Sequence, residues 1–176
     1  MQIHWDFKLS PAKYAQQGRD YIIFPLLLRC PACHANVRLY RHGFYVRNVL
    51  TRCSEYRIVI CRYLCRSCRV TISLLPRFLL PRFQRCQISI LEALEGFFVS
   101  GIRGLYRQIM TFYIRRFRQN ILALILGFRE VGLMLKIPPD ENEKAIKLIE
   151  LLLDTLAGDP NSAEPQIQLN FMALSL

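Results

Sequence analysis

Negative charge is almost missing from the middle of this sequence, and lysine is missing there altogether. Positions 29–118 of the 176 residues carry three acids, Glu55, Glu92 and Glu95, against 17 basic residues, all of which are arginine. A nuclease or transposase active site needs clustered carboxylates to hold its metal ions, so this block offers no such centre. No Ser/His/Asp set or glycine-rich phosphate loop is apparent either. We therefore expect no enzymatic activity.

Long apolar runs and a secretion signal are also lacking. The longest apolar runs, such as Ile121–Phe128, are too short to span a bilayer. Residues 1–6 show no basic segment followed by an apolar one. Seven cysteines without a secretion signal favour reduced thiols, and in the cytosol paired Cys-x-x-Cys units are more often metal sites than disulfides. We expect a cytoplasmic protein without a membrane partner, associated with the nucleoid if it binds DNA.

Positive charge, by contrast, is abundant and concentrated. The chain has a net charge of +11, made up of +1 over residues 1–28, +14 over residues 29–118 and −4 over residues 119–176. The planar guanidinium group of arginine fits phosphate and the edge of guanine in a way that lysine does not. This balance favours a polyanionic partner, nucleic acid ahead of an acidic membrane surface, over a generic solvated basic surface.

Two Cys-x-x-Cys pairs form the strongest motif in the chain. Each pair can make a tight turn that points two thiolates at one ion, and two such turns supply the four-sulfur tetrahedron that structural zinc prefers. The 31 residues between the pairs are enough for a β-hairpin. Arginines beside the thiols favour the thiolate form. The predicted zinc ligands are Cys30, Cys33, Cys65 and Cys68.

Two other interpretations of these cysteines exist. Cys-Pro-Ala-Cys alone resembles a redox-active dithiol, although that chemistry goes with a βαβ segment and strands are expected here. Cys61, Cys65 and Cys68 have the spacing of the iron–sulfur site in radical enzymes that use S-adenosylmethionine, although this chain is too short for their barrel. We interpret Cys53, Cys61 and Cys86 as buried small apolar residues. We interpret His42 as structural.

Four segments are expected along the chain. They are a lead-in with one strand at 1–28, a zinc ribbon with a proline-containing connector at 29–85, a helical and DNA-binding region at 86–136, and a C-terminal helix and tail at 137–176. The predicted class is α+β: a zinc-ribbon β-hairpin, a small helix-turn-helix-like domain and a C-terminal amphipathic helix.

Composition places the strands. Segments rich in Val, Ile, Tyr and Phe predict strands at Tyr21–Leu28, Val37–Leu50 and Tyr56–Leu64. Thr51–Glu55 is the expected hairpin turn, and Gly43 marks a turn or bulge. Leu74–Arg85 contains two prolines and is expected to be an extended connector.

Apolar spacing of a helical kind begins at residue 87 and predicts helices at Gln87–Phe98 and Arg103–Leu126. Two arrangements remain open. In one, Ser100–Met110 holds the short second helix of a helix-turn-helix and a third helix starts at Thr111. In the other, Arg103–Leu126 is one long recognition helix and the middle helix is missing.

A C-terminal helix is expected around Ala145–Leu156. Asp140 and Glu143 form an acidic variant of the capping box before it, and Gly158 is the expected C-terminal cap. We expect this helix to pack on the domain or to pair with a second copy of the chain.

Several basic residues of the second helix share one face. Arg103, Arg107, Thr111, Arg115 and Arg118 follow at spacings of four, four, four and three. The apolar back of the helix is expected at Tyr106, Met110, Tyr113 and Phe117. The alternatives are an ordinary solvated face and a basic helix on an anionic membrane. The predicted nucleic-acid contacts are Arg103, Arg107, Thr111, Arg115, Arg116 and Arg118, with Arg41 and Arg47 from the ribbon.

A wider pattern over residues 28–120 is similar to a known family. It consists of Cys30-Pro31-x-Cys33, Arg41-His42-Gly43-x-Tyr45-x-Arg47, Arg62-Tyr63-x-Cys65-x-x-Cys68-x-x-Thr71 and Leu75-Pro76. This pattern resembles a bacterial, transposase-associated family of uncharacterised zinc-ribbon and helix-turn-helix domains, which look like the front ends of insertion-sequence transposases. The resemblance implies DNA binding in a transposition or regulatory context, with a transposase or recombinase as a partner. It supplies no catalytic function.

Two alternatives to this function follow from the residues. One is an RNA-binding zinc ribbon of the translation or transcription machinery. The other is a protein-interaction adaptor whose basic surface docks an acidic protein. Binding to duplex DNA, duplex RNA and single strands distinguishes the first, because A-form grooves are recognised differently. Binding that survives nuclease treatment distinguishes the second.

Overall fold

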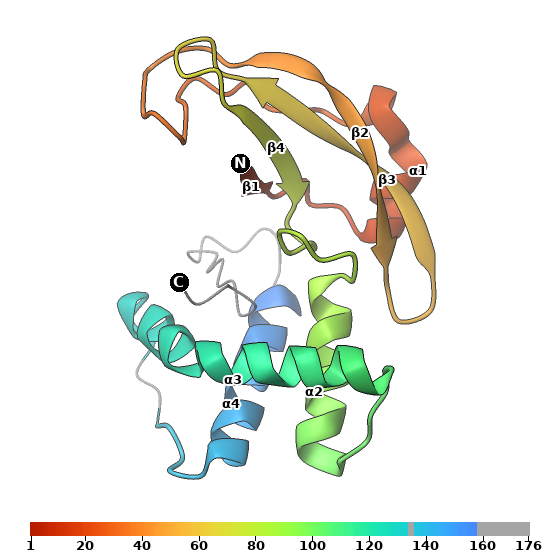
Figure 1. The fold of residues 1–176 in the computed structure, drawn as a ribbon, viewed down its shortest axis with the longest axis vertical. Helices are drawn as coiled ribbons and strands as arrows, with labels where there is room; N and C mark the ends of the chain where they lie inside the picture. Colours follow the sequence, from red (N-terminus) through yellow and green to blue (C-terminus); the bar gives the residue numbers. More distant parts are fainter. Residues whose placement is uncertain (134–135, 158–176) are drawn as a thin grey trace. The chain divides into compact units, whose positions relative to one another are not determined.

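A computed structural model describes residues 1–133 and 136–157 of the chain (Figure 1). The chain divides into two compact units, residues 1–87 and residues 88–176. The first unit holds a four-stranded sheet and one helix, and the second is helical, so the predicted α+β class is confirmed. In chain order the elements are β1 (Gln2–Trp5), α1 (Pro11–Tyr21), β2 (Tyr40–Leu50), β3 (Glu55–Leu64), β4 (Thr71–Pro76), α2 (Gln87–Ser100), α3 (Arg107–Glu130) and α4 (Glu141–Ala157).

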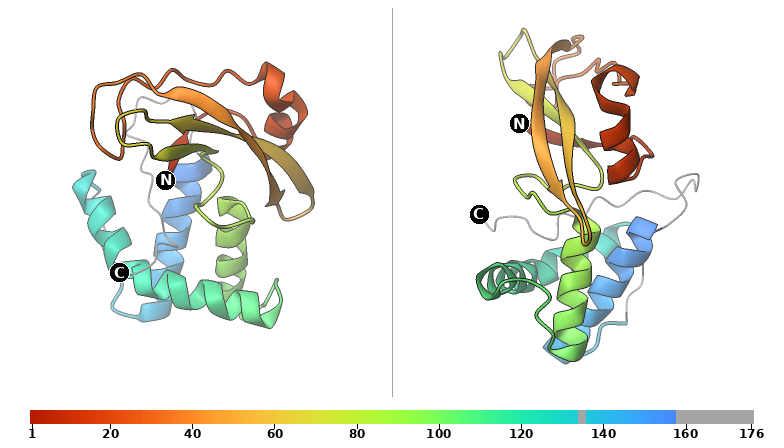
Figure 2. Two further views of the ribbon diagram at one scale, coloured as in Figure 1. Left: turned by 45° about the horizontal axis from the view of Figure 1, so that its top comes forward. Right: turned by 90° about the vertical axis from the view of Figure 1, so that its right-hand side faces the viewer.

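The sheet has the strand order β1-β4-β3-β2. The β2–β3 hairpin is antiparallel, with Tyr40 opposite Leu64 and Leu50 opposite Glu55. Strand β4 continues the antiparallel pattern on β3, and β1 adds a parallel edge to β4. Helix α1 packs on β3 and lies against one face of the hairpin (Figures 1 and 2). The N-terminal residues are therefore part of the same unit as the cysteine-bearing hairpin.

The predicted hairpin is confirmed. In its turn, the Thr51 backbone N–H donates to the Ser54 carbonyl, and the Ser54 N–H donates to Thr51 Oγ1 at 3.0 Å. The register shifts between Arg41 and Gly43, and Gly43 has φ +134°, which favours glycine. Gly43 therefore marks a bulge, as the sequence suggested.

The lead-in differs from the prediction, because its strand is Gln2–Trp5 and Tyr21–Leu28 is not a strand. The composition of residues 21–28 predicts a strand, and most of the segment is extended, but it does not pair with the sheet. Ile22 and Phe24 are buried while Ile23 is 90% exposed, so the alternation of an extended chain is real. Pro25, however, has no N–H to give to a ladder. The segment instead runs beside the sheet, where the Leu27 carbonyl accepts from the Leu39 N–H.

The expected connector is also partly wrong, because its first residues belong to β4, which ends at Pro76. Beyond that strand, the chain turns back to the hairpin. Leu50 donates its N–H to the Gln84 carbonyl, and Cys86 donates its N–H to the Leu50 carbonyl. The segment after β4 is thus tied to the end of β2 by backbone hydrogen bonds.

The second unit contains the predicted helix α2 and a helix α3 of the expected length that lies four residues further along the chain. Helix α3 begins at Arg107, four residues later than predicted, and continues through Gly127 to Glu130. Residues 101–106 form no helix. A short second helix within Ser100–Met110 is therefore wrong, and the single long helix is the arrangement observed.

Helix α4 starts where its cap predicts. Asp140 Oδ1 accepts from the N–H groups of Asn142 and Glu143 at 2.8 and 2.9 Å, which satisfies two donors of the first turn. Ala145, Leu148, Ile149 and Leu152 are buried, and α4 contacts α3. The expected packing on the domain is confirmed, whereas Gly158 and the tail lie outside the described residues. No helix among residues 1–133 and 136–157 is long and apolar enough to cross a bilayer.

The lead-in is fastened to the sheet by Tyr14, which is fully buried and donates its hydroxyl to the Val59 carbonyl at 3.0 Å. Its ring meets Phe7 and Phe78 edge-on at centroid distances of 5.1 and 5.8 Å. Tyr14→Phe leaves the packing intact and removes one donor from a buried carbonyl. We expect it to lower the free energy of unfolding by about 1 kcal/mol, measured by urea unfolding.

Tyr40→Phe is the matched control, because Tyr40 is 44% exposed and its hydroxyl makes no hydrogen bond within the described residues. It should change the free energy by less than about 0.5 kcal/mol. Equal unfolding midpoints for the two variants would mean that the Tyr14 hydrogen bond contributes nothing.

Candidate metal centre and basic surface

The two Cys-x-x-Cys turns have the same backbone conformation. Cys30 donates its N–H to the carbonyl five residues ahead, in Ala35, and Cys65 does the same to Val70, at 3.0 and 3.1 Å. The residue after the second cysteine has a positive φ in both turns, +59° in His34 and +57° in Arg69. The first turn leads into β2, and the second joins β3 to β4. The hairpin therefore brings two equivalent turns to one end of the sheet.

The structure brings the four predicted ligands together. The Sγ atoms of Cys30 and Cys68 are 3.8 Å apart, those of Cys33 and Cys65 are 3.9 Å apart, and all four lie within 4.8 Å of one another. A disulfide would need a separation of about 2.0 Å. A tetrahedral zinc site with Zn–S bonds of about 2.3 Å has S–S edges of about 3.8 Å. The sulfur atoms thus have the spacing that a tetrahedral metal ion requires.

The pKa values of the clustered thiols also favour a cation between the four sulfur atoms. The Cys68 backbone N–H donates toward the Cys65 sulfur and is the main reason why the pKa of Cys65 falls to about 6. The Val70 N–H favours the thiolate of Cys68, but burial and hydrogen bonds with the neighbouring thiols raise the pKa of Cys68 above its usual value. Four sulfurs this close cannot all ionise without a positive charge between them, and a divalent ion meets that demand.

The other cysteines lie outside this cluster. Cys61 is fully buried in the core of the first unit, where burial raises its pKa, and Cys86 is also buried. Cys53 is exposed in the hairpin turn, so the prediction that it is buried is wrong. His42 is exposed, and among the described residues the metal-ligating cluster consists of cysteines only. Four protein ligands leave no open position, which is typical of a structural rather than a catalytic site.

The net charge is distributed very unevenly between the two structural units. Residues 1–87 carry 15 basic and three acidic residues, net +12, whereas residues 88–176 carry nine basic and ten acidic residues, net −1. The acids of α4 and of the tail balance the arginines of α3. The excess positive charge of this protein therefore belongs to the unit that contains the cysteines. The earlier division at residues 28 and 118 did not show this, because its middle block combined arginines from both units.

Most arginines of the first unit have no acidic partner. Between Asp20 and Glu92 the sequence has twelve arginines and one acid, Glu55. The only one of the twelve with an ion pair in the described part of the chain is Arg77, with Asp6 at 3.7 Å. The exposed arginines of this set that have no ion pair are Arg29, Arg38, Arg41, Arg52, Arg57, Arg66, Arg69 and Arg82.

The two predicted contact residues of the ribbon, Arg41 and Arg47, differ in burial and in hydrogen bonding. Arg41 is exposed, with no hydrogen bond or ion pair within the described residues. Arg47 is partly buried, and its Nη2 donates to the carbonyls of Leu80, at 3.0 Å, and Phe83. Burial lowers the pKa of Arg47. Arg47 therefore ties β2 to the segment after β4, and this structural role removes it from the predicted contacts.

An aromatic partner of the basic surface escaped the sequence analysis. The Arg66 guanidinium, in the second cysteine turn, lies 4.0 Å from the ring centroid of Tyr40 at the start of β2. Both side chains are exposed. The sequence gives no separate indication of this contact. It follows from the hairpin register, which brings the start of β2 next to the second Cys-x-x-Cys turn.

On α3, most of the predicted face exists. Arg107, Thr111, Arg115 and Arg118 are exposed and fall within an arc of about 80° at about 100° per residue. The opposite side holds Met110, Tyr113 and Phe117, which are buried. Two details differ from the prediction. Arg103 lies in the loop before the helix, and Tyr106 is 85% exposed at the N-cap position because α3 starts only after it.

The α3 arginines are not equally free. Arg118 donates to Asn142 Oδ1 at 3.4 Å and lies 5.6 Å from the centroid of the Phe98 ring. Arg116 is partly buried and lies 5.2 Å from the Phe112 ring. Arg107 and Arg115 have neither kind of interaction within the described residues. These two are the best candidates on α3 for an external ligand, and we call them the α3 pair.

Comparisons with protein-family models, with curated proteins and with solved structures found no match for this chain. The resemblance to transposase-associated domains therefore stays an expectation.

The metal site makes a direct prediction. Protein purified without added metal should contain one zinc ion per chain by elemental analysis. Cys65→Ser should abolish zinc binding and unfold the first unit, because metal binding and folding are coupled. Cys53→Ser, at an exposed position outside the cluster, should keep the full zinc content.

Cys61→Ala provides the sharper control, because Cys61 lies four residues before Cys65, on strand β3. It should keep its zinc despite a loss of core packing. Loss of zinc in this variant, or thiols oxidised in pairs in the metal-free wild type, would contradict the assignment of the four ligands.

Proposed function

We propose that this protein is a zinc-stabilised nucleic-acid-binding protein, with DNA as the expected ligand, and that the basic surface of the first unit makes the main contact. The four-cysteine site holds zinc in a structural role. Zinc fixes the end of the hairpin from which Arg66 and Arg69 project, and it takes no part in a reaction.

The observation that carries the proposal is the uncompensated charge of the first unit. Eight exposed arginines of the first unit have no acidic partner among residues 1–133 and 136–157, and the unit has a net charge of +12. Neutralising phosphates releases counterions from the nucleic acid, and this electrostatic term supplies most non-specific affinity. Exposed arginines that pair with no acid in the described part of the chain are available for phosphates.

Helix α3 is the second contact in this proposal. Arg107, Thr111 and Arg115 share its exposed face, with an apolar back that packs within the second unit. That unit has no excess positive charge, so we expect α3 to add to the binding and not to drive it. A transposition or regulatory context, with a transposase or recombinase as partner, follows from the resemblance alone.

The first test is the salt dependence of DNA binding. Log affinity for duplex DNA should fall linearly with log salt, with a slope of about −0.9 for each phosphate that the protein neutralises. Arg52→Gln with Arg57→Gln removes two exposed charges of the hairpin and should weaken binding and flatten the slope. An affinity of the wild type that does not depend on salt would contradict the proposal, and binding that survives nuclease treatment would indicate a protein partner.

The α3 pair supplies the second test. Arg107→Ala with Arg115→Ala should weaken binding and flatten the slope by about one unit for each arginine that neutralises a phosphate in the wild type. Helix stability should change little, because alanine is the better helix former and both positions are exposed. Full affinity with an unchanged slope would show that α3 does not touch the ligand and that the first unit binds alone.

A further inference from the structure

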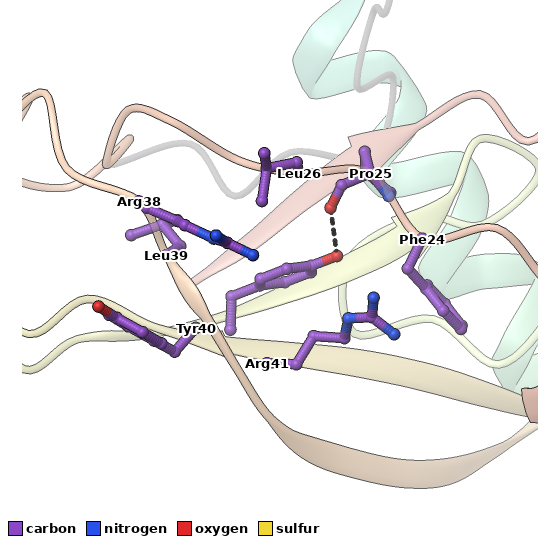
Figure 3. Close-up of a pocket in the computed structure, with 8 residues that line it drawn as sticks. Phe24, Pro25, Leu26, Arg38, Leu39, Tyr40 and Arg41 are labelled. Atoms are coloured by element: carbon purple, nitrogen blue, oxygen red, sulfur yellow. Dashed lines mark hydrogen bonds between the residues drawn. The ribbon is translucent and has the colours of Figure 1, made fainter.

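A hollow of about 370 Å³ lies on the first unit, next to the start of β2 (Figure 3). It is formed by the chain segment before the first cysteine turn, by the residues leading into β2, and by one residue of β3. Its lining residues are Phe24, Pro25, Leu26, Arg38, Leu39, Tyr40, Arg41 and Tyr63. All of them belong to one unit, so the hollow does not depend on how the two units are placed.

The floor of the hollow is aromatic and has no free polar group. Tyr63 is 1% exposed and Phe24 is 7% exposed. The Tyr63 hydroxyl donates to the Pro25 carbonyl at 2.6 Å, so its one polar atom is already satisfied. This bond also holds the segment around Pro25 at the side of the hollow, as Figure 3 shows. Both rings are covered, so the apolar surface that stays open to a ligand is mainly the side chain of Leu26, which is 57% exposed.

The rim is cationic. Arg41 stands opposite Tyr63 in the hairpin register and therefore lies on the same face of the sheet. Arg38 and Arg41 both line the hollow, and both are labelled in Figure 3. Neither arginine has a hydrogen bond or an ion pair within the described residues, and the sequence has no acid between Asp20 and Glu55. Two free guanidinium groups over an apolar floor favour a ligand that is both anionic and flat.

We propose that this hollow receives a single unpaired nucleotide of the bound nucleic acid, with its base packed against Leu26 and its phosphate between Arg38 and Arg41. This inference rests on the proposed function and makes it more specific. A paired base enters a hollow only at the cost of unpairing and unstacking, whereas an unpaired base can be turned out and packed against apolar side chains at a much lower cost. The site therefore selects single-stranded over duplex segments.

The size and chemistry of the hollow favour a nucleotide over an acidic peptide. Its volume is near the lower end of the range of about 300–1,000 Å³ that small-molecule sites occupy. An Asp or Glu side chain would satisfy the arginines but has no flat ring to cover Leu26. A nucleotide supplies both groups, and every base has a flat face, so such a contact does not require a particular sequence.

A matched pair of variants tests the exposed apolar lining of the hollow. Leu26, which lines the hollow, is 57% exposed, and Ile23, which does not line it, is 90% exposed. Leu26→Glu and Ile23→Glu therefore change the charge of the full-length chain equally, at two exposed positions of one segment. The probes are a fluorescent oligothymidylate, its duplex with oligoadenylate, and a phosphodiester strand of the same length that lacks bases. Affinities come from fluorescence anisotropy at one salt concentration.

We expect the wild type to bind oligothymidylate more tightly than the base-free strand. Leu26→Glu should lower the affinity for oligothymidylate about tenfold relative to Ile23→Glu, as removal of one stacked base does. Both variants should bind the duplex equally. Equal losses for oligothymidylate in the two variants, or equal wild-type binding of the base-free strand, would overturn the nucleotide site and leave the proposed function standing. No binding of any probe by the wild type would refute the proposed function itself.

A second pair of variants tests the rim and does not depend on how Leu26→Glu folds. Arg38→Gln with Arg41→Gln removes the same charge as Arg52→Gln with Arg57→Gln, at exposed positions of the same unit. Only the Arg38 and Arg41 variant should lose the preference for oligothymidylate over the duplex. If both double variants keep that preference, or lose it equally, the hollow does not bind the nucleotide. Equal displacement of oligothymidylate by a polyglutamate peptide of matched charge would also overturn the nucleotide site, because it would show recognition of charge alone.

Discussion

Convergence of four sulfur atoms on one point is the constraint on which the first unit depends. Cys30 ends the segment that leads from α1, and Cys33 precedes β2, while Cys65 and Cys68 join β3 to β4. The cluster therefore fixes the start of β2, the end of β3 and the start of β4, which all lie at the open end of the hairpin. Strand β1 pairs only with β4, so the position of the N-terminus also follows from it. A unit of 87 residues has a small core, for which a structural metal held by these cysteines would compensate.

A metal ion at the cysteine cluster would also affect the electrostatic repulsion within the first unit. A unit with a net charge of +12 repels itself when it is compact. A divalent ion held by four thiolates carries a net negative charge, and Arg29, Arg66 and Arg69 lie next to these ligands in the sequence. The proposed zinc site would therefore stabilise the fold by cross-linking the chain and by offsetting the charge that the proposed binding requires. Arg66 gains further support from the Tyr40 ring beneath it.

Local features of this fold could be predicted from the sequence, and features that depend on distant partners could not. The Gly43 bulge, the Asp140 cap and each of the two Cys-x-x-Cys turns are encoded within a few residues. Cys30 and Cys68 are 38 residues apart, but their meeting could be predicted because the two turns share a recognisable motif. Strand β1 was missed because it is short and its partner is far along the chain, with Gln2 opposite Ser73. Strand β4 was missed although its partner β3 directly precedes it, because it is short and runs into a segment with two prolines. The start of α3 was placed four residues early because Arg103 and Tyr106 fit the helical spacing, although Gly101 and Gly104 favour a loop there.

The same distinction explains why the hollow could not be predicted while the arginines around it could. Arg38 and Arg41 are visible as charges, but Tyr63 and Pro25 are 38 residues apart and meet only in the folded unit. A surface that depends on such interactions exists only while the unit is folded. If zinc holds the unit together, loss of zinc must abolish binding although no ligand touches the metal. By linkage, a polyanion that binds only the folded unit must stabilise it, and more so at low salt, where the repulsion that it neutralises is strongest.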